Sequence, residues 1–284
     1  MDVKNDRLFS CPLCNSNNTY QKFKKDGISY FNCKTCDFLF SKPSVNENFQ
    51  ESINDFEDAY IKYFDTNDTD KRNFDLILNW LKKEFNFNGK SILDVGCGSG
   101  KFVNHLRKNG INAKGIEYSR PLYEKYLKDK EYFYTFSLEE FNEKIGGVFD
   151  VVTLFDVLEH IDFPGKFIQE ISKLQTLNGY LIKEIPLHGT LHSRLLGKKW
   201  HFFNKYHLSY FRKKRLVKLL DELGYNLIQD RYRGKYFHFS YLLKYFYFSF
   251  FKKNNLNIPE FLEKAYIYIN TYDIYIACFQ KKYV

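Results

Sequence analysis

Short apolar runs alternate with stretches of helical periodicity from about residue 70 to the end of the chain. A short apolar run is typical of a strand, and apolar positions three or four apart are typical of an amphipathic helix. The predicted strands cover residues 91–95, 112–117, 132–136, 149–155, 180–185, 225–231 and 272–280. The predicted helices cover residues 70–88, 101–109, 123–127, 167–178, 212–223 and 260–268. Because strand and helix alternate, the pattern predicts an α/β fold with a parallel, doubly wound sheet.

A glycine-rich turn joins the first predicted strand to its helix. The turn has the sequence Ser91-Ile-Leu-Asp-Val-Gly-Cys-Gly-Ser-Gly100, in which Asp94 precedes glycines at three alternate positions. In open α/β sheets such a turn lies at the carboxyl end of a strand, where small ligands bind. Glycine suits this place because the backbone must turn sharply and because a Cβ would strike the ligand.

An acidic residue ends the second predicted strand. Residues 112–117 have the sequence Asn-Ala-Lys-Gly-Ile-Glu, and Glu117 lies 23 residues beyond Asp94. This separation fits a βαβ unit whose second strand places a carboxylate near a ribose, where it accepts hydrogen bonds from both hydroxyls. The two strands together predict a site for a nucleotide-like ligand.

Four of the six cysteines form two pairs near the N-terminus. Cys11 and Cys14 make the first C-x2-C pair, and Cys33 and Cys36 make the second after 18 intervening residues. This spacing is typical of a four-thiolate zinc site, and Asp26-Gly27 between the pairs predicts a hairpin turn. Four cysteines leave no open coordination position, so we predict a zinc ribbon whose Zn²⁺ is structural. Such a ribbon can also bind RNA or a partner.

The chain divides into three predicted parts. Residues 1–42 form the zinc ribbon, and residues 43–69 form a polar, acidic linker with a short helix around 56–64. Residues 70–284 form the α/β domain, with an aromatic and helical insertion at 236–268 between its last two strands.

Composition and charge leave several partners open. The chain has 30 Phe, 23 Tyr and a formal net charge of +9. This charge suits nucleic acid, a phosphorylated substrate or a membrane surface, whereas dispersed lysines favour an ordinary solvated surface. Residues 1–10 have no apolar core, so we expect no signal peptide. The most apolar stretch, 236–251, is too short to span a bilayer and carries His238 and Lys244. We therefore expect a cytoplasmic protein without a transmembrane segment.

Several motifs in combination resemble those of class I S-adenosylmethionine-dependent methyltransferases. They are Leu93-Asp-Val-Gly-Cys-Gly-Ser-Gly100, Gly115-Ile-Glu117, Phe149-Asp-Val-Val152 and Leu158-Glu-His160. A dinucleotide site would prefer G-x-G-x-x-G, and the acid before this turn would repel a pyrophosphate. The resemblance covers about residues 70–284. It implies a Rossmann-like, seven-stranded sheet whose last strand is antiparallel.

The resemblance also implies which residues surround the cofactor. These are Asp94, Gly96, Gly98, Gly100, Glu117, Ser137 and Phe155. The glycines would pass under the methionine end of S-adenosylmethionine, Asp94 would help to hold its amino group, and Glu117 would bind its ribose. Ser137 would lie beside the adenine, and Phe155 would line the cofactor mainly through its backbone.

A hydroxyl acceptor benefits from a base that removes its proton while the methyl group is transferred in line. The candidates are His160, His188, His192, His201, His207 and the carboxylate of Glu184. We predict His160 and His207 as catalytic residues. His160 follows the fourth strand, although Glu159-His160 recurs across the superfamily with different acceptors, which favours a structural or gating role. His207 lies in the segment 188–211, where these enzymes place acceptor-binding elements.

The acceptor itself is less well specified. Enzymes that methylate a base amino group usually carry Asn/Asp-Pro-Pro-Tyr/Phe after the fourth strand, where this chain has Phe155-Asp-Val-Leu158. With the ribbon, Gly197-x-x-Trp200 and His207-x-x-Tyr-Phe211 resemble elements of methyltransferases of bacterial surface-glycan and natural-product pathways. That resemblance implies O-methylation of a sugar, a nucleotide-sugar or a related small molecule.

Two other functions stay open. In an RNA methyltransferase, the ribbon and the basic surface would bind RNA with an affinity that falls steeply with salt. A scaffold without turnover would keep the fold, but the intact cofactor residues argue against it. The stretch 236–251 would cap the acceptor site, contact a membrane that carries a lipid-linked substrate, or simply pack against the domain.

Overall fold

The structure is a computed structural model that describes residues 9–42, 70–85, 89–129, 131–240, 242–243, 247, 258–263 and 265–282. The predicted linker with its short helix lies outside the described residues, and so does half of the apolar stretch at 236–251. Within the described part of the chain, none of the helices has the length and apolar character needed to cross a bilayer.

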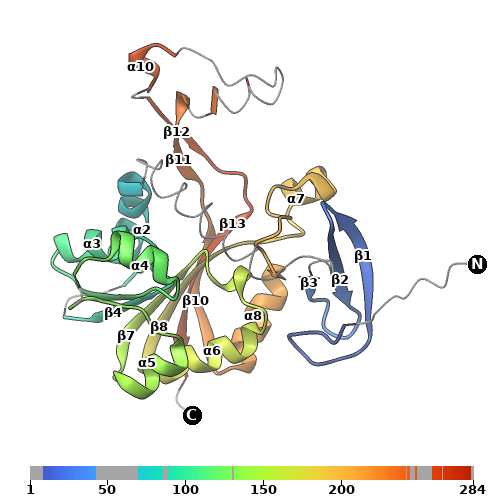
Figure 1. The fold of residues 1–284 in the computed structure, drawn as a ribbon, viewed down its shortest axis with the longest axis horizontal. Coiled ribbons are helices and arrows are strands. Elements are labelled where there is room, and N and C mark those ends of the chain that lie inside the picture. Colours follow the sequence, from blue (N-terminus) through green and yellow to red (C-terminus); the bar gives the residue numbers. More distant parts are fainter. Residues whose placement is uncertain are drawn as a thin grey trace, which may run out of the picture.

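One seven-stranded sheet forms the centre of the α/β domain, with the strand order β10-β13-β8-β7-β4-β5-β6. Its strands are β4 (Ser91–Val95), β5 (Asn112–Ile116), β6 (Phe133–Tyr134), β7 (Phe149–Phe155), β8 (Gln175–Pro186), β10 (Tyr225–Tyr232) and β13 (Ile274–Lys281). Neighbours from β8 to β6 are parallel, and β13 is antiparallel to both β8 and β10. The prediction of a mostly parallel, Rossmann-like sheet with an antiparallel last strand is confirmed (Figure 1).

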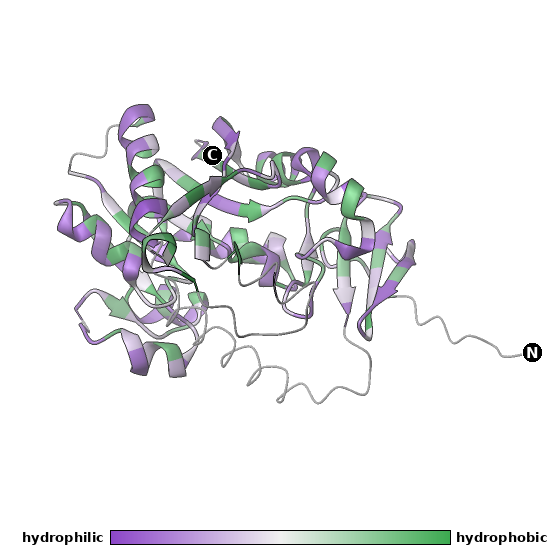
Figure 2. Cartoon of the chain, turned by 90° about the horizontal axis from the view of Figure 1, so that it is seen from above, coloured by the Kyte–Doolittle hydropathy of each residue, from purple (hydrophilic) through white to green (hydrophobic). Residues whose placement is uncertain are grey.

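Helices cover both faces of this sheet. One face packs against α2 (Asp70–Glu84) and α3 (Lys101–Lys108), and α4 (Arg120–Tyr126) follows β5. The other face packs against α5 (Leu138–Lys144), α6 (Pro164–Lys173) and α8 (Lys213–Glu222). The helix α3 illustrates why these helices pack on the sheet, because its apolar residues Phe102, Val103 and Leu106 are buried while polar residues occupy its other positions. Figure 2 shows such interspersed apolar and polar segments along the helices and strands.

The N-terminal residues form a second, smaller sheet. Its strands are β1 (Thr19–Lys25), β2 (Ile28–Cys33), β3 (Leu39–Lys42) and β9 (Ser209–Tyr210), in that order. We call β1, β2 and β3 the N-terminal sheet. The fourth strand comes from the α/β domain, since Leu39 pairs with Tyr210. The sheet is thus completed by a segment more than 150 residues away along the chain, and Trp200 packs in its core.

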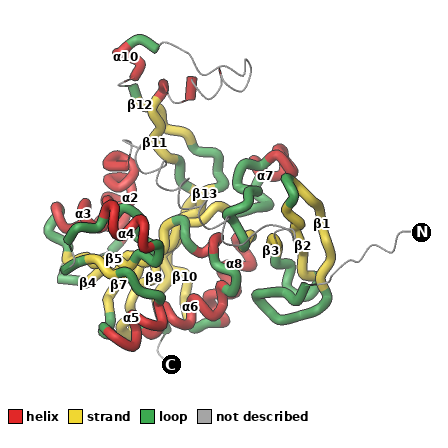
Figure 3. Tube along the Cα trace, viewed as in Figure 1, coloured by secondary structure: helices red, strands yellow, loops and turns green. Residues whose placement is uncertain are grey.

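A hairpin replaces part of the predicted helix at 260–268. The helix α10 covers only Glu260–Glu263, and β12 (Tyr266–Ile269) then pairs antiparallel with β11 (Lys235–His238). The prediction was wrong at 266–268 because Tyr-Ile-Tyr-Ile is a β-branched and aromatic sequence, which favours a strand. Figure 3 shows this hairpin projecting away from the central sheet.

The helix predicted at 167–178 also ends early. The helix α6 ends at Lys173, and β8 begins at Gln175. The β7–β8 register shifts between the Phe149–Gln175 pair and the Val151–Tyr180 pair, and Asn178 has a positive φ of 60°. The Asn178-Gly179 pair therefore lies at an irregularity inside the strand and not at the end of the helix.

Candidate active site

The glycine turn connects β4 to α3 at the carboxyl edge of the sheet. Gly96, Gly98 and Gly100 all have positive φ values, of 74°, 54° and 71°. The amide of Gly96 donates to the carbonyl oxygen of Ile116 at 2.8 Å, which ties the turn to the end of β5. A Cβ on Gly96 would lie 2.6 Å from Cγ2 of Val157. The positive φ values confirm the predicted sharp turn, and the close contact of an added Cβ would be with Val157 of the protein itself.

We expect Gly100→Ala to lower the free energy of unfolding by about 2–4 kcal/mol. A Cβ at Gly100 would lie 2.5 Å from Cδ2 of Leu127 and 2.7 Å from Cζ of Phe133. Gly110→Ala is the matched control, since Gly110 has a similar φ of 76° but no described atom within 4 Å of the added Cβ. It should lose only about 1 kcal/mol from backbone strain. Urea unfolding checks both values, and equal losses would contradict the packing argument.

Glu117 follows β5 and is buried. Its Oε2 accepts a hydrogen bond from the amide of Gly98 at 2.8 Å, and its Oε1 accepts one from the amide of Ser119 at 2.8 Å. The carboxylate thus holds the glycine turn against the end of β5. Each carboxylate oxygen has two lone pairs, so this geometry is compatible with further hydrogen bonds from ribose hydroxyls.

Asp94 lies within β4 and is buried. It accepts a hydrogen bond from Oγ1 of Thr153 at 2.5 Å. Burial and the nearby charge of Glu117 raise the pKa of Asp94 to about 7, against the opposing effect of the Thr153 hydroxyl. Among the described residues, no Lys or Arg forms an ion pair with this carboxyl group. A ligand ammonium group would supply the missing positive charge.

Ser137 and Phe155 have clear structural contacts. Ser137 caps α5: its hydroxyl accepts from the amide of Glu140 at 3.1 Å, and its own amide donates to the Glu140 carboxylate at 3.1 Å. The hydroxyl of Ser137, which the resemblance places beside the adenine, therefore caps a helix in this structure. Phe155 is half-buried at the end of β7, and its ring packs edge-on against Phe102, with 5.0 Å between the ring centroids.

The two histidines predicted as catalytic lie next to each other. The ring centroids of His160, at the end of the short helix η1 (Leu158–His160), and His207 are 4.8 Å apart. His160 Nδ1 lies 2.8 Å from the carbonyl oxygen of Tyr206, and burial lowers the pKa of both imidazoles.

Together with the buried Glu159, His160 and His207 offer three potential metal-ligand atoms within 4.8 Å of one another. This donor set suits a divalent transition metal. His207 is buried and His160 is half-buried, which favours a positioning role over direct proton transfer to an acceptor.

An ion-pair network occupies the ends of β7 and β8. Glu184 is buried and pairs with Arg233 and with Lys235, whose Nζ lies 3.0 Å from Oε1 of Glu184 and 3.0 Å from Oδ2 of Asp156. Burial alone would raise the pKa of Glu184, but Arg233 and Lys235 lower it to about 2. Glu184 is consequently a paired, ionised carboxylate, which makes it a poor base.

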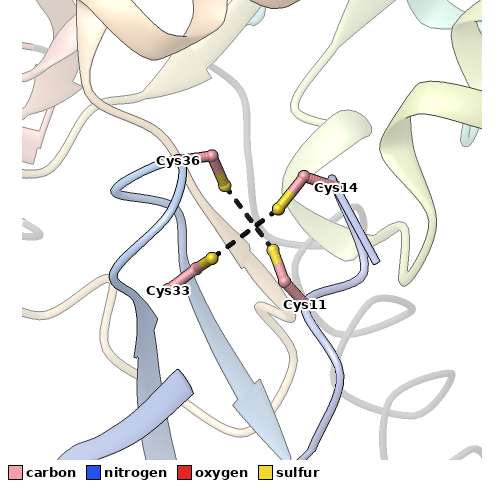
Figure 4. Close-up of side chains that lie close together, drawn as sticks. All are labelled: Cys11, Cys14, Cys33 and Cys36. Carbon is pink, nitrogen blue, oxygen red and sulfur yellow. Dashed lines mark hydrogen bonds between the residues drawn. The ribbon is translucent and has the colours of Figure 1, made fainter. Parts of the chain in front are cut away.

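The four N-terminal cysteines converge on one point. The sulfur atoms of Cys11 and Cys36 are 3.6 Å apart, as are those of Cys14 and Cys33, and all four lie within 4.8 Å of one another. Figure 4 shows the four side chains directed at each other. These distances exceed a disulfide bond and are close to the edge of about 3.8 Å expected for a tetrahedron with metal–sulfur bonds of about 2.3 Å.

Comparisons with known proteins match most of the α/β domain. A family model described as a methyltransferase domain matches residues 66–230. A ubiquinone biosynthesis O-methyltransferase from Nitrosococcus oceani is 31% identical over 193 residues, which cover 59% of this chain and 81% of that protein. An enzyme of the same name from Dechloromonas aromatica is 31% identical over 134 residues, which cover 44% of this chain and 58% of that protein.

Two solved structures share the fold. A magnesium protoporphyrin IX methyltransferase from Synechocystis PCC 6803, with bound SAH, has 18% identity and a TM-score of 0.50 over 75% of this chain and 84% of that chain. A SAM-dependent methyltransferase from Archaeoglobus fulgidus has 17% identity and a TM-score of 0.50 over 73% of this chain and 94% of that chain. At these identities the likeness concerns the fold of the sheet and its helices.

Proposed function

The chain belongs to the methyltransferase-domain family and is a class I S-adenosylmethionine-dependent methyltransferase, and on this premise we propose that it O-methylates a small molecule. The observation that carries the transfer to oxygen is the similarity to O-methyltransferases over 81% of the length of one of them. A sugar or nucleotide-sugar of a glycan or natural-product pathway is the acceptor that we propose. Its support is the sequence resemblance at 197–200 and 207–211.

The residues at the ends of β4 and β5 fit S-adenosylmethionine. When bound, this cofactor supplies an electrophilic methyl group on a positively charged sulfur. Asp94, whose pKa is raised to about 7 by burial, would hold the cofactor's amino group and become ionised. Glu117 would accept hydrogen bonds from the ribose while it anchors the amide of Gly98. The glycines would let the backbone approach the methionine end, because none of them carries a Cβ.

We propose that the four N-terminal cysteines bind one structural Zn²⁺. Two C-x2-C pairs whose sulfurs lie 3.6 Å apart across the site support a tetrahedral thiolate centre. Four protein ligands leave no position for a substrate, so the ion would stabilise the N-terminal sheet and take no part in methyl transfer.

The affinity for S-adenosylmethionine should rise with pH up to about 7 and then level off, until the cofactor's own amino group loses its proton at about pH 8. Below the pKa of Asp94, which is about 7, the carboxyl group must lose a proton before it can hold an ammonium group. Each pH unit below this value should therefore weaken binding by up to about tenfold. Calorimetry between about pH 5.5 and pH 8 measures this slope. Asp94→Asn should bind more weakly and remove the slope, and an unchanged slope in this variant would contradict the assignment.

A labelled-methyl transfer screen tests the proposed acceptor class. The purified chain and S-adenosylmethionine with a labelled methyl group are incubated with cell extract that is separated into glycans, RNA, proteins and small metabolites. Label in the small-metabolite or glycan fraction supports the proposal. Label in RNA, with binding that weakens steeply as salt rises, would instead support the RNA methyltransferase alternative.

A further inference from the structure

A buried carboxylate lies beside the end of β8. Asp273 is fully buried and directly precedes β13, where Ile274 pairs with Pro186. The amide of Leu187 donates to the carbonyl oxygen of Asp273 at 2.8 Å. This places Asp273 at the carboxyl edge of the parallel strands, which is the edge where open α/β sheets bind their ligands.

Three side chains donate hydrogen bonds to Asp273. Its Oδ2 accepts from Nδ1 of His192 at 2.7 Å and from Nε1 of Trp200 at 2.9 Å, and its Oδ1 accepts from the Thr271 hydroxyl. Burial alone would raise the pKa of Asp273, but these three hydrogen bonds lower it. An ionised carboxylate can only accept, so Nδ1 of His192 carries the proton and Nε2 presents a lone pair.

His192 is accessible, unlike the carboxylate behind it. It lies in the first turn of α7 (Leu191–Leu196), and its side chain is 28% exposed. A row of ring contacts leads from it to the end of β7, with centroid distances of 6.1, 4.1, 5.7 and 4.8 Å. The row runs in the order His192, His201, Phe202, His207 and His160. Four successive ring contacts thus link His192 to His160 in η1, which follows β7.

We propose that His192 is the general base for the acceptor hydroxyl and that Asp273 is its positioning residue, an inference that rests on the proposed O-methylation. The acceptor oxygen forms a bond to the methyl carbon while the carbon–sulfur bond breaks, and the electron pair of that bond stays on sulfur. The acceptor's proton moves to Nε2 of His192. The resulting imidazolium is stabilised by Asp273 and later releases the proton to water.

The first test needs no acceptor. S-adenosylmethionine and S-adenosylhomocysteine differ by one methyl group and by one positive charge on sulfur, so they form a matched pair of probes. The nitrogen chemical shifts of the His192 imidazole are measured by NMR with each ligand bound. They should differ between the two complexes, because only S-adenosylmethionine carries a positive charge on sulfur beside the acceptor hydroxyl. The other charged or titratable groups around His192 are Asp273 and His201, with Lys25 close to His201, and these are the same in both complexes. Identical chemical shifts in the two complexes would overturn the proposal.

The second test uses the acceptor found in the labelled-methyl screen. His192→Ala should lower kcat by about 100-fold or more while S-adenosylmethionine binding stays unchanged. Asp273→Asn should lower kcat and move the acid limb of the pH–rate profile to lower pH, because the imidazole loses its neighbouring anion. Leu191→Ala is the control for a general disturbance of α7, since Leu191 is exposed in the same turn. Full activity of His192→Ala would overturn the proposal, whereas a wild-type chain that labels no fraction would overturn the proposed function instead.

Discussion

Replacing Glu117 with alanine is expected to weaken S-adenosylmethionine binding by about 100-fold or more without unfolding the domain. In the structure its carboxylate accepts hydrogen bonds from the amides of Gly98 and Ser119, each at 2.8 Å. The substitution removes the proposed ribose acceptor and also frees the glycine turn from β5. Hydrogen bonds to charged groups contribute about 1.5–3 kcal/mol each. Losing the proposed bonds from the two ribose hydroxyls is therefore enough to weaken binding by about 100-fold. Isothermal titration calorimetry measures the affinity.

Two further variants make this prediction specific. Glu139→Ala is the matched control, because Glu139 is exposed in the first turn of α5, and its loss should leave the affinity unchanged. Glu117→Gln keeps the shape but lacks the charge and one acceptor, so its affinity should lie between those of the wild type and Glu117→Ala. Near-wild-type affinity in Glu117→Ala would contradict the assignment of Glu117 to the cofactor.

The sheet and the glycine turn are the parts that local sequence patterns predict well. The strand β4, its three glycines and α3 lie within 18 residues, so apolar periodicity and the demand for positive φ both appear in one short segment. Asp94 and Glu117 are also placed by their positions in the sequence, because Asp94 belongs to the first strand of one βαβ unit and Glu117 directly follows the second. Predictions of this kind succeed where the residues that determine a feature are neighbours along the chain.

Contacts between residues that are far apart along the chain are not predicted by any local sequence pattern. His192 and Asp273 are 81 residues apart, and no sequence motif contains both of them. His192 was one of several candidate bases, and only its Nδ1 contact with a buried carboxylate separates it from the rest. The two-residue strand β9 is too short for any periodicity and becomes a strand because β3 offers it an edge. Such features depend on tertiary pairing, which a single sequence does not display.

The pairing of β9 connects the N-terminal sheet to the proposed acceptor side of the enzyme. The hydroxyl of Ser41 donates to the carbonyl oxygen of His207 at 2.7 Å, and the amide of Ser41 donates to the carbonyl oxygen of Leu208 at 3.0 Å. Lys42 also pairs with Asp162, with 2.7 Å between Nζ and Oδ1. The N-terminal sheet therefore holds the backbone of the segment that carries His207, while the glycine turn and Glu117 make their own contacts with β5.

Cys33→Ser is accordingly expected to separate methyl transfer from cofactor binding. Cys33 is fully buried and ends β2, and its loss should release the proposed zinc, whose binding can contribute about 10–16 kcal/mol to the folding of small domains. Without the ion the N-terminal sheet should loosen and no longer hold β9. Turnover should then fall by about 100-fold or more, since small misplacements of acceptor-binding residues are costly, while the affinity for S-adenosylmethionine should change by less than about threefold.

Three measurements on the same preparation check this separation: metal content, calorimetric cofactor affinity and labelled-methyl transfer. Retained cofactor binding shows that the α/β domain is folded, so a loss of turnover is assigned to the acceptor side. Thr35→Ala is the matched control, because Thr35 lies between Cys33 and Cys36, is exposed and offers no sulfur. It should keep about one zinc per chain and normal turnover. A zinc-free Cys33→Ser chain with wild-type turnover would show that the acceptor segment keeps its position without the N-terminal sheet.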